Sequence, residues 1–177
     1  MAKGTGPSDS LSKLPKLTAE LQKFIDGMGV YFESQGIPRI GGRMLGVLMI
    51  AHWPLTPEDM ANVLQVSRGS ISTNLRMLTA SGMVERALMP GSRLTHFAFS
   101  DEAMEHRIAA GIRSTQAFRR LVQEASAALP GGDPSRHHLV DSLEWSDLLL
   151  EALHNAIEHW KAHRAQGSHS HTVRAGE

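Results

Sequence analysis

Residues 55–82 of the chain read LTPEDMANVLQVSRGSISTNLRMLTASG. The stretch opens with a helix start, because the Thr56 hydroxyl can cap the first turn and Pro57 suits the first helical position. Two acidic residues follow, and their charge complements the positive end of the helix dipole. We therefore expect a short helix from residue 57 to about residue 64, followed by a tight turn.

A second helix is predicted over residues 68–80. Ser67 is placed to cap its start, and Gly82 stands where a left-handed residue ends a helix. Three apolar residues recur at the spacing of one helical face, which we expect to face the core. These residues are Ile71, Leu75 and Leu78. Two short helices joined by a tight turn predict a helix-turn-helix.

The opposite face of this second helix carries polar and small side chains. Arg68, Ser72 and Arg76 are four residues apart and form one outward row. The major groove of B-DNA admits one helix, and an arginine on it can donate to a guanine edge or to a phosphate. Gly69 and Ser70 permit close approach of the helix start, whose free N–H groups favour a phosphate. We expect this face to read DNA.

A β-hairpin is predicted after the second helix. Residues 83–89 and 94–99 alternate in the manner of strands, and Pro90-Gly91-Ser92 supplies the turn between them. We expect Arg93 to contact the minor groove or the phosphates beside it. The full set of residues expected to contact DNA is Ser67, Arg68, Gly69, Ser70, Ser72, Thr73, Asn74, Arg76, Arg86, Arg93 and Thr95.

Longer helices are predicted on both sides of this region. Residues 17–34 carry a broad apolar stripe, and residues 39–52 are nearly all apolar, which predicts the buried centre of the domain. A long helix is expected over residues 100–129, and a last one over residues 136–164. The last helix has a heptad seam that we expect to pair two chains. The seam consists of Leu139, Leu143, Ser146, Leu150, Leu153, Ile157 and Trp160.

The predicted fold class is mainly α, a winged helix-turn-helix with a two-stranded β-wing and long helices that form a dimerisation region. Residues 1–16 are expected to be a flexible arm. Residues 17–129 are expected to be the DNA-binding domain with flanking dimerisation helices. Residues 135–164 are expected to be a C-terminal dimerisation helix, and residues 165–177 a disordered tail.

Composition limits the class of protein. The chain has 177 residues, no cysteine and a net charge of zero. It has no apolar run of the length a membrane span needs and no apolar stretch at its start, so a cytoplasmic location is expected. Charge is divided unevenly, with six arginines against three acids over residues 39–97 and two basic residues against six acids over residues 133–163. The basic middle therefore suits a polyanion.

No catalytic site, cofactor site or metal site is predicted. An enzyme would need a nucleophile beside a base, or a metal, and the sequence shows neither arrangement. His159 and His163 have metal-like spacing, but no cysteine accompanies them, and His169 and His171 lie in the tail. We expect structural or solvated roles for these histidines.

The arrangement resembles the MarR-type winged-helix regulators, and in particular their GbsR-like branch. The resemblance lies in LTPEDMA at residues 55–61, VSRGSISTNLRxL at residues 66–78 and GMV at residues 82–84. The opening IGGRMLG of residues 40–46 also looks like that family's second helix, and the match covers about residues 17–129. The resemblance implies a homodimer, formed by the outer helices, that binds a palindromic operator in double-stranded DNA.

The resulting hypothesis is a sequence-specific transcriptional regulator, a homodimeric repressor that a small-molecule effector releases. Tyr31 and Trp53 are candidates to line an effector site, because an aromatic ring can stack on a small molecule or hold a cation. The alternative is a winged-helix module that binds proteins without sequence-specific DNA binding. Positive charge distinguishes the two hypotheses, since an interaction module does not need four arginines on one surface. These arginines are Arg68, Arg76, Arg86 and Arg93.

Overall fold

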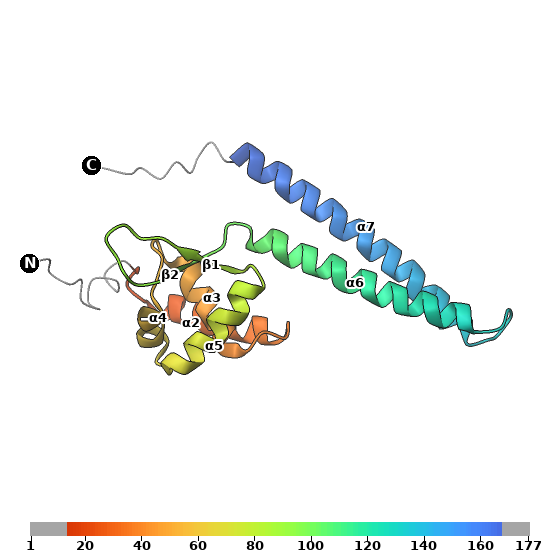
Figure 1. Cartoon of the computed structure of the whole chain (residues 1–177), viewed down its shortest axis with the longest axis horizontal. Coiled ribbons are helices and arrows are strands. Elements are labelled where there is room, and N and C mark those ends of the chain that lie inside the picture. The colour runs from red at the N-terminus through yellow and green to blue at the C-terminus, as the bar shows by residue number, and fades with distance from the viewer. Residues whose placement is uncertain (1–13, 168–177) are drawn as a thin grey trace, which may run out of the picture. The chain divides into compact units, whose positions relative to one another are not determined.

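The computed structural model describes residues 14–167, which divide into two compact units between Ala103 and Met104 (Figure 1). The predicted arm falls mostly on residues 1–13 and the predicted tail mostly on residues 168–177, and both stretches lie outside the described residues. Residues 165–167 belong to the last helix rather than to a tail. No helix among the described residues is both long and apolar enough to cross a membrane.

The predicted fold class is confirmed, because the described part of the chain is mainly helical with one small antiparallel sheet. The two helices of the helix-turn-helix begin and end at the residues that the sequence predicts. The outer helices and the strands differ from their predicted bounds by a few residues. The elements are α2 (Ala19–Glu33), α3 (Arg39–Ile50), α4 (Pro57–Leu64), α5 (Arg68–Ala80), β1 (Val84–Ala87), β2 (His96–Phe99), α6 (Ala103–Ala128) and α7 (Arg136–Gly167).

The wing is a short β-hairpin, and one residue just before α4 pairs with its second strand. Strands β1 and β2 pair antiparallel, with Val84 opposite Phe99 and Ala87 opposite His96. Leu55, just before α4, bridges to Phe97 through two backbone hydrogen bonds of 2.9 and 2.8 Å. The strands are shorter than the predicted ranges of residues 83–89 and 94–99, because the backbone pairing between them ends at Ala87 and His96. The bridge ties the wing to the start of the helix-turn-helix.

The core of the first unit forms around α3, as predicted. Met44, Leu45 and Val47 are fully buried there, and they belong to one cluster with buried residues of α2, α4, α5 and both strands. Helices α2 and α3 approach closely, because Gly42 leaves no side chain at their contact. A Cβ atom on Gly42 would lie 2.6 Å from the Met28 carbonyl oxygen.

The second unit is a helical hairpin in which α6 and α7 run antiparallel (Figure 1). Near the turn, Arg136 donates to the Leu129 carbonyl oxygen at 2.9 Å and to the Ser126 hydroxyl at 3.4 Å. The backbone N–H of Ser135 donates to Asp133 at 2.8 Å, and this hydrogen bond is the main reason why the pKa of the Asp133 carboxyl is lowered. These contacts fix the turn between the two helices.

The seam of α7 faces α6 of the same chain. Ser146, at its centre, is fully buried, and both methyl carbons of Leu153 lie within 4 Å of the position that a Cβ on Gly111 would take. Arg119 Nε donates to Asp147 at 2.6 Å, and Arg164 pairs with Glu105 at 3.4 Å. The heptad pattern that we expected to pair two chains is therefore used within one chain. A role of α7 in dimerisation remains a prediction.

Replacement of Gly42 by alanine should lower the free energy of unfolding by about 1–3 kcal/mol, because the new methyl group meets backbone of α2 rather than a movable side chain. Gly27 on α2 is the matched control, since a Cβ there has no neighbour within 4 Å. Gly27→Ala should leave stability unchanged or raise it by about 1 kcal/mol through helix propensity. Urea denaturation measures both, and equal losses in the two variants would contradict the close contact.

Candidate nucleic-acid interface

A capping box fixes the start of α4. The Thr56 hydroxyl accepts from the Asp59 N–H at 3.2 Å, and the Asp59 carboxylate accepts from the Thr56 N–H at 2.9 Å. Asp59 is only 2% exposed, so its charge is held by these hydrogen bonds rather than by water. Gln65 then adopts a left-handed conformation with φ of 54°, which turns the chain toward α5.

The rotation of α5 about its axis follows from three buried side chains. Ile71 and Leu78 are fully buried and Leu75 is 4% exposed, as predicted. Ser67 caps the helix by accepting from the Ser70 N–H at 3.2 Å. Burial of one face leaves the opposite face in solvent. Its exposed residues are Arg68, Gly69, Ser72, Thr73, Arg76 and Ala80.

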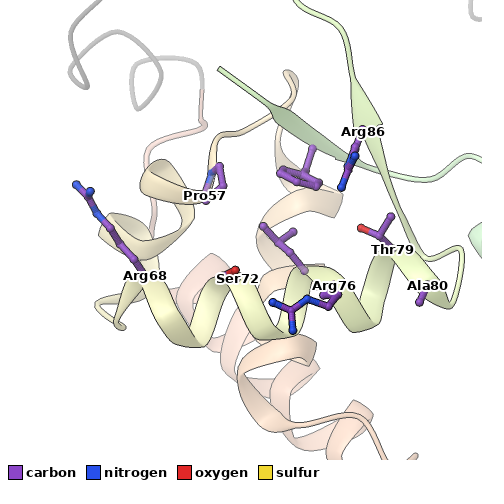
Figure 2. Close-up of a pocket in the computed structure, with 9 residues that line it drawn as sticks. Pro57, Arg68, Ser72, Arg76, Thr79, Ala80 and Arg86 are labelled. Atoms are coloured by element: carbon purple, nitrogen blue, oxygen red, sulfur yellow. The ribbon is translucent and has the colours of Figure 1, made fainter. Parts of the chain in front are cut away.

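An open hollow of about 590 Å³ lies between this face and the wing (Figure 2). Ser72 and Arg76 reach it from α5, and Arg86 reaches it from β1 (Figure 2). The sequence did not indicate that Pro57, Leu75, Thr79, Ala80 and Phe97 also line it. The hollow brings together Arg76 and Arg86, which are ten residues apart in the chain.

Two further hollows continue the same surface. One of about 470 Å³ follows the wing from Arg86 to Thr95 and includes Arg93. Another of about 290 Å³ lies between the start of α4, Arg68 and Thr95. Because Arg86 and Arg68 each line the first hollow as well, the three hollows form one continuous surface. We call it the helix–wing surface.

The Arg68 side chain departs from the simple outward row. Its Nη2 atom donates to Oε1 of Glu58, and Figure 2 shows the side chain turned away from Ser72 and Arg76. Glu58 was expected to serve only the start of its own helix. The contact depends on how α4 and α5 are packed together, which residue spacing along either helix does not give.

Asn74 does not lie on the exposed face, contrary to the expectation that it contacts DNA. It is 7% exposed, and its Nδ2 donates to the Ser70 carbonyl oxygen at 2.8 Å. Its Oδ1 points at α3, 2.9 Å from the position of a Cβ on Gly41. Position 74 lies three residues after Ile71 and four before Leu78, so it shares their buried face.

Not every arginine of the basic middle belongs to the helix–wing surface. Arg43 pairs with Asp26 of α2 at 2.9 Å, and its side chain is only 22% exposed. This pair ties α2 to α3, and Arg43 lines none of the three hollows of the surface. The positive charge of the surface therefore comes from Arg68, Arg76, Arg86 and Arg93, all of them exposed.

The two aromatic residues expected near an effector are separated. Trp53 is half-exposed and lines a hollow of about 310 Å³ with Leu48, Phe99 and Asp101. Tyr31 is also half-exposed, but it packs edge-on against Phe32 of its own helix and does not line that hollow. Of the two, only Trp53 lines this hollow.

One group of possible metal ligands occurs among residues 14–167, and the sequence did not single it out. His137, His138 and Asp141 have ligand atoms within 4.8 Å of one another, and all three are exposed. The His137 Nε2 atom lies 3.3 Å from the Asp141 carboxylate, and their spacing of four residues on α7 accounts for this proximity. His154 instead contacts the Leu150 carbonyl oxygen of its own helix at 2.7 Å.

Known proteins similar to this chain include transcriptional regulators. No family model matches the chain. The chain is 34% identical over 118 residues to the HTH-type transcriptional regulator MmpR5 of Mycobacterium tuberculosis, a match that covers 66% of this chain and 72% of that protein. A crystal structure of a transcriptional regulator shares 29% identity with a TM-score of 0.67 and covers 81% of this chain and 99% of its own. Wild-type MarR from E. coli, in its apo form, shares 18% identity with a TM-score of 0.39 and covers 52% and 73%.

The neighbouring acids Asp59 and Glu58 should differ in their effect on folding. Asp59→Ala removes the buried half of the capping box and should lower the free energy of unfolding by about 1–2 kcal/mol. Glu58→Ala removes a half-exposed carboxylate and should change it by less than about 1 kcal/mol. Thermal and urea denaturation test the contrast. A larger loss for the Glu58 variant would show that the cap is assigned to the wrong acid.

Proposed function

Because the chain belongs to the helix-turn-helix-type transcriptional regulators, we propose that it binds double-stranded DNA sequence-specifically through the helix–wing surface. The observation that carries the proposal is the continuity of this surface, which joins the exposed face of α5 to the arginines of the wing. An exposed helix with small and polar side chains suits the major groove, and a basic hairpin beside it suits the adjacent minor groove.

Roles on the exposed face of α5 and on the wing follow from chemistry and position. Arg76, Ser72 and Thr73 are the side chains that would meet base edges, because they stand on the exposed middle of α5. A Cβ on Gly69 would meet only the Ser67 hydroxyl oxygen, at 3.9 Å, so backbone at the helix start can approach a phosphate. Arg93, in the loop between β1 and β2, would contact phosphates and set the position of the wing.

We further propose that the protein acts as a homodimer. Large apolar side chains remain exposed on the α6–α7 hairpin even though its seam is covered. Trp145 and Phe118 are half-exposed and pack edge to face with ring centroids 6.0 Å apart. Patches of this kind mark interaction sites, and a second copy of the hairpin is the partner that the resemblance to MarR-type regulators implies. The exposed apolar residues are Phe118, Leu121, Val140, Trp145 and Leu148.

A dimer would present two copies of α5 to successive major grooves about 34 Å apart, which suits a palindromic operator. Blocking of polymerase at that operator makes the protein a repressor. A small molecule in the hollow beside Trp53 would release it by favouring another spacing of the two α5 helices. We also propose that the protein is of the MarR type, and of its GbsR-like branch, because residues 55–61, 66–78 and 82–84 resemble that family.

A second candidate function is supported by two apolar residues of the wing. Leu88 is 99% exposed and Leu94 is 65% exposed, although a hairpin that only follows phosphates has no use for large apolar side chains there. Both would suit a protein partner. A winged-helix interaction module therefore remains the alternative, and DNA-binding measurements separate it from the first proposal.

Arg76→Ala should weaken binding to the preferred duplex by about 1–3 kcal/mol, because it removes a donor to a base edge. Arg93→Ala should weaken binding to all duplexes alike and lower the salt slope by about one unit, because it removes a phosphate contact. Fluorescence anisotropy at several salt concentrations measures both effects. Arg113→Ala on α6 is the control, and an absence of salt-dependent binding in the unsubstituted protein would favour the interaction module.

Leu148→Glu should shift the protein toward monomer, because a charge would have to be buried in the proposed dimer interface. Leu88→Glu makes the same change at an exposed leucine of the wing and should leave the assembly unchanged. Analytical ultracentrifugation at micromolar concentration measures the mass. A monomeric unsubstituted protein would exclude the homodimer.

A further inference from the structure

The two acids at the start of α4 have different partners. Asp59 belongs to the buried capping box, and Glu58 takes no part in it. Glu58 instead accepts from Arg68, the first residue of α5. The side chains of Glu58 and Arg68 are 47% and 75% exposed, and an ion pair this open contributes little to stability. The ion pair itself therefore adds little to stability, whereas the charge of Glu58 also suits the first turn of α4.

The pair lies inside the surface that the proposed function assigns to DNA. Glu58 and Arg68 line the same hollow as Leu94 and Thr95 of the wing, and Arg68 also lines the larger hollow beside Arg76. A carboxylate within a DNA footprint costs affinity, because phosphates repel it.

We propose that Glu58 is a specificity-determining residue: it holds Arg68 at the start of α5, apart from Ser72 and Arg76, where the guanidinium can donate to a separate guanine edge, and it disfavours other duplexes. The inference rests on the proposed DNA-binding function. Glu58 is a positioning residue in this account, since it acts through Arg68 rather than on a base.

The chemistry of the guanidinium supports this role. A guanidinium has five N–H donors in a rigid plane, so a carboxylate on one nitrogen leaves the others free for a second acceptor. The ion pair restricts rotation of the side chain, and less freedom is then lost when Arg68 binds a base. A guanine offers two acceptors, O6 and N7, at the spacing of that fork.

The same carboxylate acts against incorrect sequences. Where a guanine stands opposite Arg68, the contact compensates for the nearby negative charge. Where another base stands there, Arg68 stays with Glu58 or turns to a phosphate and leaves the carboxylate facing the polyanion. The penalty is therefore greater for incorrect duplexes, which raises the ratio of specific to non-specific affinity.

The test compares Glu58→Gln with Glu33→Gln, which makes the same charge change at the exposed end of α2. The full-length protein is titrated with its selected duplex and with a scrambled duplex at several salt concentrations. We expect Glu58→Gln to tighten binding to the scrambled duplex by about three- to fivefold more than binding to the selected one, the size expected for one surface charge pair. Glu33→Gln should change both alike.

Arg68→Gln completes a double-mutant cycle and shows whether Glu58 acts through Arg68. In the Arg68→Gln background, Glu58→Gln should no longer change discrimination. If discrimination still falls there, Glu58 acts by its own charge and the positioning role is overturned. If Glu58→Gln and Glu33→Gln have the same effect on discrimination and the unsubstituted protein binds DNA, only the role of Glu58 is overturned. If the unsubstituted protein binds no duplex, the proposed function fails with it.

Discussion

The helix–wing surface depends on the burial of one face of α5. Ile71, Leu75 and Leu78 enter the same core as Met44 and Leu45 of α3, and each buried aliphatic side chain contributes about 1.5–3 kcal/mol. A rotation of α5 by a third of a turn would expose these residues and bury charged ones. The core therefore fixes which side chains of α5 meet a partner, although no core residue touches that partner.

Local contacts hold α5 and the wing in register with this core. The capping box of Thr56 and Asp59 sets the start of α4, and the backbone bridge from Leu55 to Phe97 joins that start to β2. The wing is thus attached to the chain just before the helix-turn-helix as well as just after it. This double attachment explains how a hairpin of four-residue strands keeps Arg86 beside α5.

The sequence predicted the parts of the structure that depend on neighbouring residues. Both helices of the helix-turn-helix have the predicted bounds, because Ser67, Pro57 and the capping residues act within one turn. It did not predict contacts between elements. Asn74 is polar yet faces α3, and Arg68 finds its partner ten residues away on another helix.

The long helices show the same limit. The heptad spacing of α7 correctly marks a packed seam, but spacing does not tell whether the second helix comes from the same chain or from another. Here Arg119, Arg164 and Arg136 tie the hairpin together, so α6 covers the seam. The apolar residues left over, such as Leu148, lie outside this heptad, although Trp145 and Leu148 are three residues apart on the same helix.

The central claim is that the helix–wing surface reads DNA. Selection of bound fragments from genomic DNA, repeated at low and moderate salt, tests it most directly. The account predicts enrichment of a short inverted repeat whose half-sites lie one helical turn apart, with retention that falls as salt rises. Recovery of fragments without any shared sequence, or no retention of duplex DNA at any salt concentration, would contradict it.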